Sequence, residues 1–499
     1  MQICSQCRAL LLLLIFNKKK SIVYRGAKRN TKIEESNFSF SCSGCVHKQQ
    51  ILPTDLIFNM QKSRGRTGRK RRRKHFKDLT SGGVNYSHKL EYIQLKKWLK
   101  ERGFEDNHLK PAQFSDTGRG LLTTKAFQAG ELIISLPEKC LLTTATVLNS
   151  YLGKYIVRWK PPLSPLIALC TFLIAEKHTG ERSPWKPYLD ILPKTYTCPA
   201  CLEQEVVKLL PDPLRRKAQE QRTVVQELHS SSKPFFSSLQ PLLTENVEAV
   251  FTYDALLWAW CTINTRTVYM KQPQKECFSR EPDIYALAPY LDLLNHSPNV
   301  QVRGTFNEQT RCYEIRMDSR CRKYEEVFIC YGPHDNQRLL LEYGFIAIDN
   351  PHSSVYVSTD TLLKCVFLGD KKKNTKLSIL KGHGFLENLT FGWDGPSWRL
   401  LTALKLLCLG ADEFACWKRV LLGEVISSGN EEKALKLATK ICFSLIEETQ
   451  HVLHQISKLK KDNINLEAQL ALIKGLRLED LRILQKSAEI LSNLNATVS

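Results

Sequence analysis

The segment Glu326-Val327-Phe328-Ile329-Cys330-Tyr331-Gly332 is an apolar run that ends on a tyrosine, and it predicts a β-strand. An earlier apolar run, Leu291 to Leu294, leads into the dipeptide Asn295-His296. Earlier still, Gly118-Arg119-Gly120 predicts a tight glycine turn. Each segment alone is common in proteins. Their order is more informative, because a mostly helical region at about residues 151–260 separates the glycine turn from the dipeptide.

Outside these three segments, the sequence combines strand patterns with long helical patterns, which predicts an α+β protein. We expect an N-terminal helix at residues 87–106 and a mixed-β core domain at residues 107–332, into which the helical region at about 151–260 is inserted. Residues 333–499 are nearly all helical in pattern and predict a separate C-terminal lobe.

In this order, the three segments resemble the SET domain of protein lysine methyltransferases, whose signature is an early G-x-G turn, a central N-H pair and a strand of the form E-[LV]-x-x-x-Y. Other segments resemble the subclass named after the Rubisco large-subunit methyltransferase: Trp185 to Leu189, Asn264 to Arg266, and Leu339 to Phe345. Members of this subclass insert a helical lobe into the SET fold and add a helical substrate-binding lobe. The resemblance covers about residues 90–490.

The resemblance implies S-adenosylmethionine as the cofactor. It assigns the cofactor site to Gly118, Arg119, Gly120, Arg266, Asp292, Asn295, His296 and Tyr331. The glycine turn would offer backbone groups to the methionine end, and Arg266 would lie near the carboxylate, which a planar guanidinium can bind through two hydrogen bonds. Asn295 and His296 would contact the amino-acid end and the adenine. The other use of Asp292 is to cap a helix or turn.

The resemblance also implies a lysine acceptor, with Tyr331 as the catalytic residue that orients the amine. A free lysine has a pKa of about 10.4, so keeping its amine neutral near neutral pH costs about 4 kcal/mol. Burial in an apolar channel beside a positive sulfonium lowers this pKa. The family pattern places Tyr343 and Phe345 beside that channel. The alternative is that both are ordinary aromatic residues of the hydrophobic core. The expected substrate is a histone tail or another lysine-bearing protein.

Two other functions fit the same sequence. A SET fold can serve as a non-catalytic chromatin or nucleic-acid binding scaffold, but Arg266, Asn295, His296 and Tyr331 are all present, and a degenerate site would lack at least one. One subclass member methylates a histidine and carries an amide side chain two residues after the arginine. Here that position is Val268, which cannot hydrogen-bond an imidazole, so we favour lysine.

Positive charge is concentrated before the predicted domains. The whole chain has a net charge of +22, yet residues 1–77 hold 19 basic and 3 acidic side chains. The composition of residues 60–86 predicts a disordered basic arm. We expect this arm to direct the protein into the nucleus through an importin or to contact nucleic-acid phosphates. Residues 1–59 differ in composition and have no counterpart in the resemblance, so we expect a non-core extension and a usual translation start at Met60.

The 17 cysteines are too dilute for a disulfide scaffold and predict reduced thiols, as in the nucleus and cytosol, where we expect the protein. Cys198-Pro199-Ala200-Cys201 is a single CxxC motif, and structural zinc usually takes four ligands, so we expect no metal. The apolar run Ala9 to Phe16 is much shorter than the roughly 20 residues that a spanning helix needs, so no membrane partner is expected.

Overall fold

The computed structural model describes residues 83–105, 107–365, 370–462 and 466–498. The predicted extension at residues 1–59 and the basic arm up to residue 82 lie outside this part of the chain. The strand β1 (Val84–Asn85) falls inside the stretch predicted as a disordered arm, but it pairs antiparallel with β2. A two-residue strand is too short to show periodicity in a sequence, which explains the difference.

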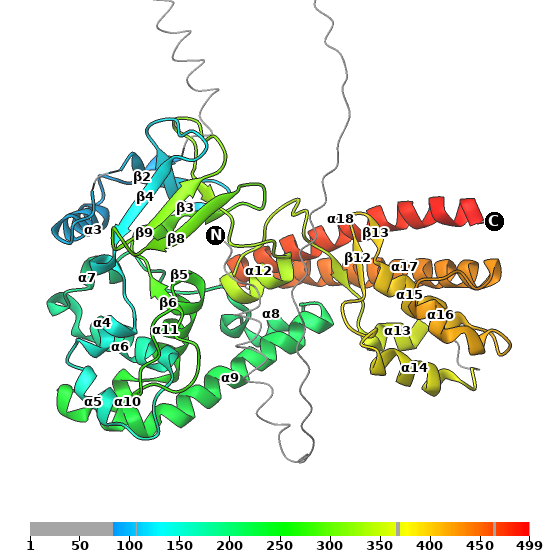
Figure 1. The fold of residues 1–499 in the computed structure, drawn as a ribbon, viewed down its shortest axis with the longest axis horizontal. Helices are drawn as coiled ribbons and strands as arrows, with labels where there is room; N and C mark the ends of the chain where they lie inside the picture. Colours follow the sequence, from blue (N-terminus) through cyan, green and yellow to red (C-terminus); the bar gives the residue numbers. More distant parts are fainter. Residues whose placement is uncertain (1–82, 106, 366–369, 463–465, 499) are drawn as a thin grey trace, which may run out of the picture. The chain divides into compact units, whose positions relative to one another are not determined.

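Several small sheets make up the core, and the fold is α+β as predicted (Figure 1). The antiparallel sheets are β1-β2-β3, with β2 (Leu109–Phe114) and β3 (Gly118–Thr123); β4-β9-β8, with β4 (Leu132–Pro137), β8 (Val302–Asn307) and β9 (Cys312–Met317); and β5-β6 (Thr267–Tyr269 and Tyr285–Leu287). One pair is parallel, β7 (Asn295–His296) with β10 (Phe328–Ile329). The core is therefore a mixed-β structure.

The predicted glycine turn at residues 118–120 is wrong in detail. Residues 115–117 make the turn, and Gly118 begins β3 with a φ of +75°. Arg119 and Gly120 lie within the strand, because β2 pairs with β3 along its whole length. Gly120 is still required there, since a Cβ atom would overlap the carboxylate of Glu326.

Backbone pairing brings the three signature segments together. In the parallel pair, Phe328 lies opposite Asn295 and Ile329 lies opposite His296. The residues just before β10 pair with β3 through an antiparallel bridge between Leu122 and Glu326, and the Val327 amide donates to the Leu121 carbonyl at 2.8 Å. Residues about 200 positions apart in sequence thus share one side of the core.

The predicted N-terminal helix is shorter than expected. Helix α3 covers Leu90–Glu101, and Gly103 follows it with a φ of +89° that ends the helical path. The inserted helices extend beyond the predicted 151–260 at both ends: α4 (Thr144–Leu148), α5 (Gly153–Arg158), α6 (Pro165–Thr179), α7 (Lys186–Leu189), α8 (Gln204–Val207), α9 (Asp212–Ser237), α10 (Val247–Val250) and α11 (Tyr253–Arg266).

Helix α11 carries Arg266 from the insertion to the core. Its N-terminus is fixed by Thr252, whose hydroxyl accepts a hydrogen bond from the Ala255 amide at 3.1 Å. The helix packs against α6, which is mostly apolar and is buried from Pro165 to Glu176. Directly after Arg266 the chain enters β5, so the arginine lies where the helical insertion joins the sheet.

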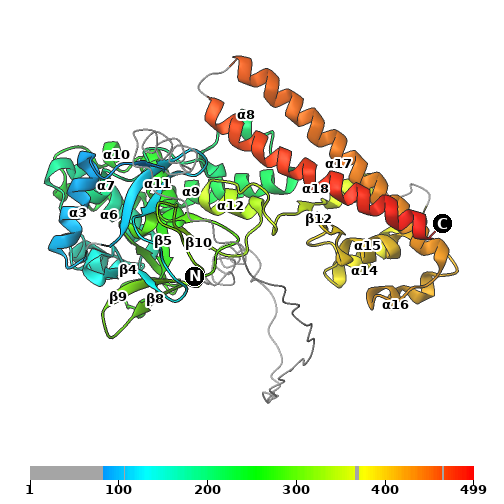
Figure 2. The same ribbon diagram turned by 90° about the horizontal axis from the view of Figure 1, so that it is seen from above.

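The C-terminal part is mainly helical, as predicted. Its elements are α12 (Asn336–Tyr343), β11 (Val355–Tyr356), α13 (Thr359–Cys365), α14 (Lys373–Gly382), β12 (Thr390–Gly392), β13 (Gly395–Pro396), α15 (Trp398–Cys408), α16 (Trp417–Leu421), α17 (Ser428–Asp462) and α18 (Glu467–Val498). The long helices α17 and α18 run side by side in both ribbon views (Figures 1 and 2). A hydrophobic core joins them to α15 and the β11-β12-β13 sheet.

A second hydrophobic cluster joins this lobe to the insertion. It contains Leu340 of α12, residues of α8 and α9 such as Val206 and Leu214, and Leu470 and Ile473 of α18. Asp335 caps the N-terminus of α12, because its carboxylate accepts from the Arg338 amide at 2.7 Å, and Gly344 caps the C-terminus with a φ of +76°. This framework fixes the aromatic residues at the end of α12.

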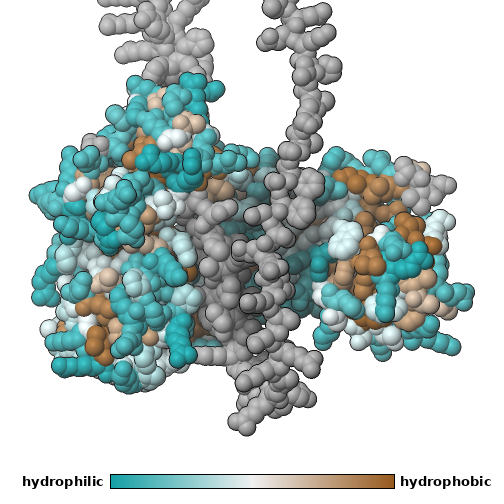
Figure 3. All heavy atoms as spheres, in the orientation of Figure 1, coloured by the Kyte–Doolittle hydropathy of each residue, from teal (hydrophilic) through white to brown (hydrophobic). Residues whose placement is uncertain are grey.

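Strongly apolar residues appear among polar ones on the surface of the C-terminal lobe (Figure 3). Leu422 is 77% exposed, Val425 is 62% exposed and Trp398 is 55% exposed. The indole nitrogen of Trp398 lies beside Gly423, which follows Leu422 directly, so Trp398 and Leu422 are close together at α15 and α16. Within the part of the chain that the structure describes, no helix combines the length and hydrophobicity that crossing a membrane requires.

Candidate active site

A cavity of about 260 Å³ opens where the insertion, the core sheets and the end of α12 meet. Most of the residues that the sequence singled out line it: Arg119, Arg266, Asp292, Asn295, Tyr331, Tyr343 and Phe345. Gly118, Gly120 and His296 are not among its lining residues. Elements from four separate parts of the chain therefore contribute to one site.

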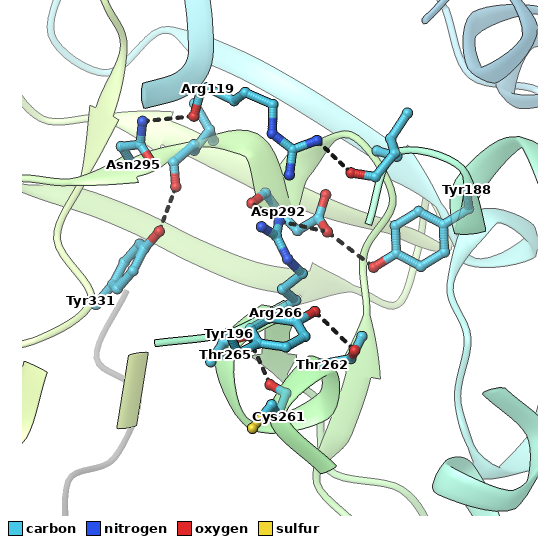
Figure 4. A network of polar contacts seen from close by, with 12 residues as sticks. Arg119, Tyr188, Tyr196, Cys261, Thr262, Thr265, Arg266, Asp292, Asn295 and Tyr331 are labelled. Carbon is cyan, nitrogen blue, oxygen red and sulfur yellow. Dashed lines mark hydrogen bonds and ion pairs between the residues drawn. The ribbon is translucent and has the colours of Figure 1, made fainter. Parts of the chain in front are cut away.

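A buried ion pair lies on one side of the cavity. The Arg266 guanidinium Nη1 donates to the Asp292 carboxylate at 3.3 Å and to the Asp292 carbonyl at 3.2 Å. The Tyr188 hydroxyl of α7 donates to the same carboxylate at 3.0 Å. Figure 4 shows Asp292 between the arginine and the tyrosine. Asp292 thus serves a buried network, and the capping role considered from sequence is not what the structure shows.

Burial and neighbouring charges set the pKa values of this pair. Burial raises the pKa of Asp292, while Arg266 and the Tyr188 hydrogen bond oppose the rise. For Arg266, burial disfavours the charge, but Asp292 and the neighbouring tyrosines outweigh that effect and raise its pKa. Arg266 therefore stays positively charged at the cavity.

A polar network fixes Asn295 at the opposite end. The Asn295 amide donates to the Arg119 carbonyl at 2.9 Å and to the Glu326 carboxylate at 2.7 Å (Figure 4 shows the first contact). The Thr117 hydroxyl donates to the other Glu326 oxygen at 2.6 Å. The Arg119 side chain reaches across the cavity rim and donates to the Ile191 carbonyl at 2.6 Å. The Asn295 amide and the Thr117 hydroxyl thus both donate to Glu326, which orients the asparagine amide.

Tyr331, two residues after the end of β10, lines the cavity. The hydroxyl donates to the Leu294 carbonyl at 2.7 Å, so its oxygen lone pairs remain available to accept. Burial raises the pKa of Tyr331, which keeps the phenol protonated near neutral pH. Its ring lies 4.8 Å from Tyr343 and 6.1 Å from Phe345, centroid to centroid, so three aromatic rings form one wall.

His296 lies behind Tyr331 instead of in the cavity. Its Nδ1 accepts a hydrogen bond from the Tyr331 amide at 3.0 Å, and its ring is 5.2 Å from the Tyr331 ring. An accepting Nδ1 leaves the proton of a neutral imidazole on Nε2. Burial, with the nearby His334 and His352, lowers the pKa of His296 to about 4. The side chain of His296 therefore positions the tyrosine, and the contact of His296 with a cofactor stays a prediction.

Several residues of the site were not singled out from the sequence. Tyr196 lines the cavity and hydrogen-bonds the Thr262 hydroxyl at 2.8 Å, and burial raises its pKa to about 12. Glu326 orients Asn295, and its place in the quoted strand motif could have identified it from the sequence. Thr195 and Thr197 lie in an irregular segment, which carries no sequence pattern.

The ion pair generates a stability prediction. Asp292→Asn removes the countercharge of a buried arginine, so we expect a loss of about 3 kcal/mol in the free energy of unfolding, measured by urea denaturation. The matched control is Asp318→Asn, because Asp318 pairs with an Arg303 that is 73% exposed, and such a surface pair contributes less than about 1 kcal/mol. Equal losses in the two variants would contradict a structural role for the buried pair.

His296 generates a pH prediction. Unfolded histidine titrates near 6.5 and folded His296 near 4, so unfolding takes up a proton between these pH values. Stability should therefore fall as the pH decreases from 6.5 to 4, by up to about 3 kcal/mol from this residue. His296→Gln should show a flatter stability profile over that range than the wild type. Replacing the exposed His108 by Gln is the control and should leave the slope unchanged.

Comparisons with known proteins identify the family. The SET domain model matches residues 118–332, and the Rubisco LSMT substrate-binding model matches residues 368–484. The chain is 63% identical over 435 residues to SET domain-containing protein 4 of Homo sapiens, which covers 87% of this chain and 99% of that relative. It is 26% identical over 425 residues to the actin-histidine N-methyltransferase of Homo sapiens, covering 80% of this chain and 68% of the relative.

Solved structures of Rubisco LSMT share the fold. The structure bound to AdoMet has a TM-score of 0.52, and the structure bound to sinefungin and monomethyllysine has a TM-score of 0.56. Each is 21% identical and covers 82% of this chain and 93% of the other. The matches to the family models and to the 63% identical relative confirm the family predicted from the sequence motifs. The chain belongs to the SET-domain family, in the group that carries a Rubisco LSMT substrate-binding domain and includes SET domain-containing protein 4.

Proposed function

We propose that the protein transfers a methyl group from S-adenosylmethionine to lysine side chains of a histone or of another protein. The observation that carries the proposal is the convergence of the Arg266–Asp292 pair, Asn295 and the Tyr331 hydroxyl on one cavity with aromatic walls. Rubisco LSMT, which has the same fold, has been solved with AdoMet and with monomethyllysine.

The residues present fit the proposed cofactor. Arg266 lines the cavity, and its buried Nε has no hydrogen-bond partner among the described residues. A carboxylate of the cofactor would satisfy this donor, and a second cation, Arg119, lines the same cavity. Asn295 would orient the amino-acid end through its fixed amide. When bound, S-adenosylmethionine supplies a methyl group activated by a sulfonium.

Tyr331 orients the acceptor. Because its proton is given to the Leu294 carbonyl, the hydroxyl oxygen faces the cavity as an acceptor, which suits an N–H of a lysine amine. With its pKa raised by burial, Tyr331 is not a phenolate near neutral pH and does not remove the proton of the ammonium. Its contribution is alignment, and we expect the lysine proton to leave to solvent before transfer.

The aromatic wall favours a neutral amine. Tyr331, Tyr343 and Phe345 provide apolar surface for the lysine methylenes, and exclusion of water lowers the pKa of a lysine amine. A tight wall also limits side reaction with water.

The C-terminal lobe supports a protein substrate. Residues 368–484 match the Rubisco LSMT substrate-binding model, and this range includes the exposed apolar residues Trp398, Leu422 and Val425. A surface of this type at α15 and α16 suits contact with a folded protein more than with a small molecule.

Tyr331→Phe tests the chemistry. It removes one hydroxyl and almost no volume, so cofactor affinity should remain within about twofold while methyl transfer falls roughly 10²-fold. Asn295→Ala should weaken cofactor binding first, because the amide belongs to the cofactor end of the cavity. Calorimetric S-adenosylmethionine binding and single-turnover methyl transfer, measured on each variant, separate the two effects.

The matched control for this experiment is Tyr324→Phe, which removes the hydroxyl of a tyrosine that is 47% exposed and does not line the cavity. It should leave both measurements unchanged. Wild-type turnover by Tyr331→Phe would mean that another group aligns the acceptor. Failure of the wild type to bind S-adenosylmethionine would reject the enzyme and favour a binding scaffold.

Histidine methylation is the second candidate, favoured by the relative that is an actin-histidine N-methyltransferase. The sequence argument against it used Val268, but this side chain is buried in β5 and does not line the cavity. The preference for lysine therefore rests on the aromatic wall and on the fold shared with a lysine-bound enzyme.

Product analysis decides between the two acceptors. The protein is incubated with methyl-labelled S-adenosylmethionine and, separately, with histones and with a histone-free cytosolic extract, and the labelled products are hydrolysed to amino acids. Label in methyllysine is the expected result, and labelled histones would extend the proposal to chromatin. Label in methylhistidine alone would contradict lysine specificity.

A further inference from the structure

Three thiols gather beside the segments that line the cavity: Cys198, Cys201 and Cys261. Cys201 ends the short helix η3 (Pro199–Cys201), Cys261 lies on α11, and their Sγ atoms are 3.2 Å apart. All three are free thiols; Cys201 is partly exposed, whereas the other two are buried. An S–S bond is about 2.05 Å long, so these two sulfur atoms need only about 1 Å of approach to form one.

The surroundings make Cys201 the reactive member of the pair. A hydrogen bond with Cys261 lowers the pKa of Cys201, burial opposes this effect, and the positive charge of Arg222 supports it. Arg222 is held in place by its donation to the Ala200 carbonyl at 3.2 Å and to the Leu202 carbonyl. Hydrogen bonds with Cys198 and Cys201, followed by burial, raise the pKa of Cys261. Cys201 is thus the better thiolate and the more accessible one.

Both segments that carry the thiols also build the cavity. Tyr196 and Thr197 precede the CxxC motif and line the cavity, while Thr265 and Arg266 follow Cys261 and line it from α11. A hydrogen bond of 2.8 Å between the hydroxyls of Tyr196 and Thr262 joins the same two segments. Figure 4 shows Tyr196, Cys261 and Arg266 close together. A covalent bond between the two segments would therefore change the positions of residues that line the cavity.

We propose that Cys201 and Cys261 form a reversible disulfide when a peroxide oxidises the protein, and that this modification lowers the affinity of the cavity for its cofactor. The cofactor effect rests on the proposed function, whereas the disulfide itself does not.

The chemistry balances with peroxide as the oxidant. The Cys201 thiolate attacks one peroxide oxygen, the O–O bond breaks, and hydroxide leaves to become water, so that Cys201 becomes a sulfenic acid. The Cys261 sulfur then attacks the Cys201 sulfur, the S–O bond breaks, and a second water is released as the S–S bond forms. Two thiols lose two electrons and two protons, and one peroxide becomes two waters. A dithiol reductant reverses the step by thiol–disulfide exchange.

A metal site is a different use of clustered cysteines, but the described residues contain no group of three or more His, Cys, Asp or Glu side chains arranged to hold a metal ion. The partial exposure of Cys201 and the 3.2 Å distance between its Sγ atom and that of Cys261 suit a redox pair.

The test uses the full chain, reduced and then treated with hydrogen peroxide. After the remaining thiols are blocked, peptide mass spectrometry without reductant should show a link between Cys201 and Cys261, removed by dithiothreitol. Cys201→Ser should not form the link, and the control Cys277→Ser, which replaces a partly exposed cysteine outside the cluster, should form it normally. A link from Cys198 to either thiol, or oxidation of Cys201 to sulfinic acid without a link, would overturn the assignment.

Two measurements test the coupling to the cavity. S-adenosylmethionine affinity should fall at least about tenfold on oxidation of the wild type and of Cys277→Ser, should recover with dithiothreitol, and should stay constant in Cys201→Ser. Amide hydrogen exchange at residues 195–201 and 261–266 should change on oxidation of the wild type and of Cys277→Ser, and should not change in Cys201→Ser. A disulfide that alters neither affinity nor exchange would contradict the coupling. If the reduced wild type binds no S-adenosylmethionine, the proposed function fails, while mass spectrometry and hydrogen exchange still decide the redox proposal.

Discussion

The buried charge of Arg266 is the constraint on which the arrangement of the site depends. A guanidinium at this depth requires a countercharge, which Asp292 supplies from 26 residues later in the chain. The Tyr188 hydroxyl donates to the same carboxylate. Because Arg266 ends α11 and Asp292 lies just before β7, satisfying the charge fixes the helical insertion against the core. Asp292 is followed closely in the chain by Asn295 of β7, which lines the same cavity. Stability and site geometry are therefore linked through one ion pair.

Sequence motifs predicted the composition of the site better than its geometry. Arg266, Asn295 and Tyr331 were identifiable because residue type, order and spacing match a family signature, and the cavity brings them together. Periodicity also indicated the helical insertion and the helical C-terminal lobe. Local patterns do not describe pairing between distant segments, so Arg119 and Gly120 were read as a turn when β2 makes them part of a strand.

Burial and partner choice explain the remaining differences. The family resemblance predicted that His296 contacts the cofactor, and this stays a prediction. Because consecutive residues in a strand point to opposite faces, the His296 side chain faces the backbone of Tyr331, which the sequence did not indicate. Tyr196 gave no signal because its segment is irregular and its role depends on Thr262, 66 residues later. The approach of Cys201 to Cys261 was equally invisible, since only one of these thiols belongs to the CxxC motif. Tertiary packing alone creates these contacts.

The most direct measurement is a crystal structure of the full chain with S-adenosylhomocysteine and a lysine-containing substrate peptide. The account predicts the cofactor product in the cavity beside Arg266 and Asn295, and the lysine nitrogen within hydrogen-bond distance of the Tyr331 hydroxyl, with Tyr343 and Phe345 along its methylenes. A cofactor bound outside this cavity, or a lysine that does not approach Tyr331, would contradict it.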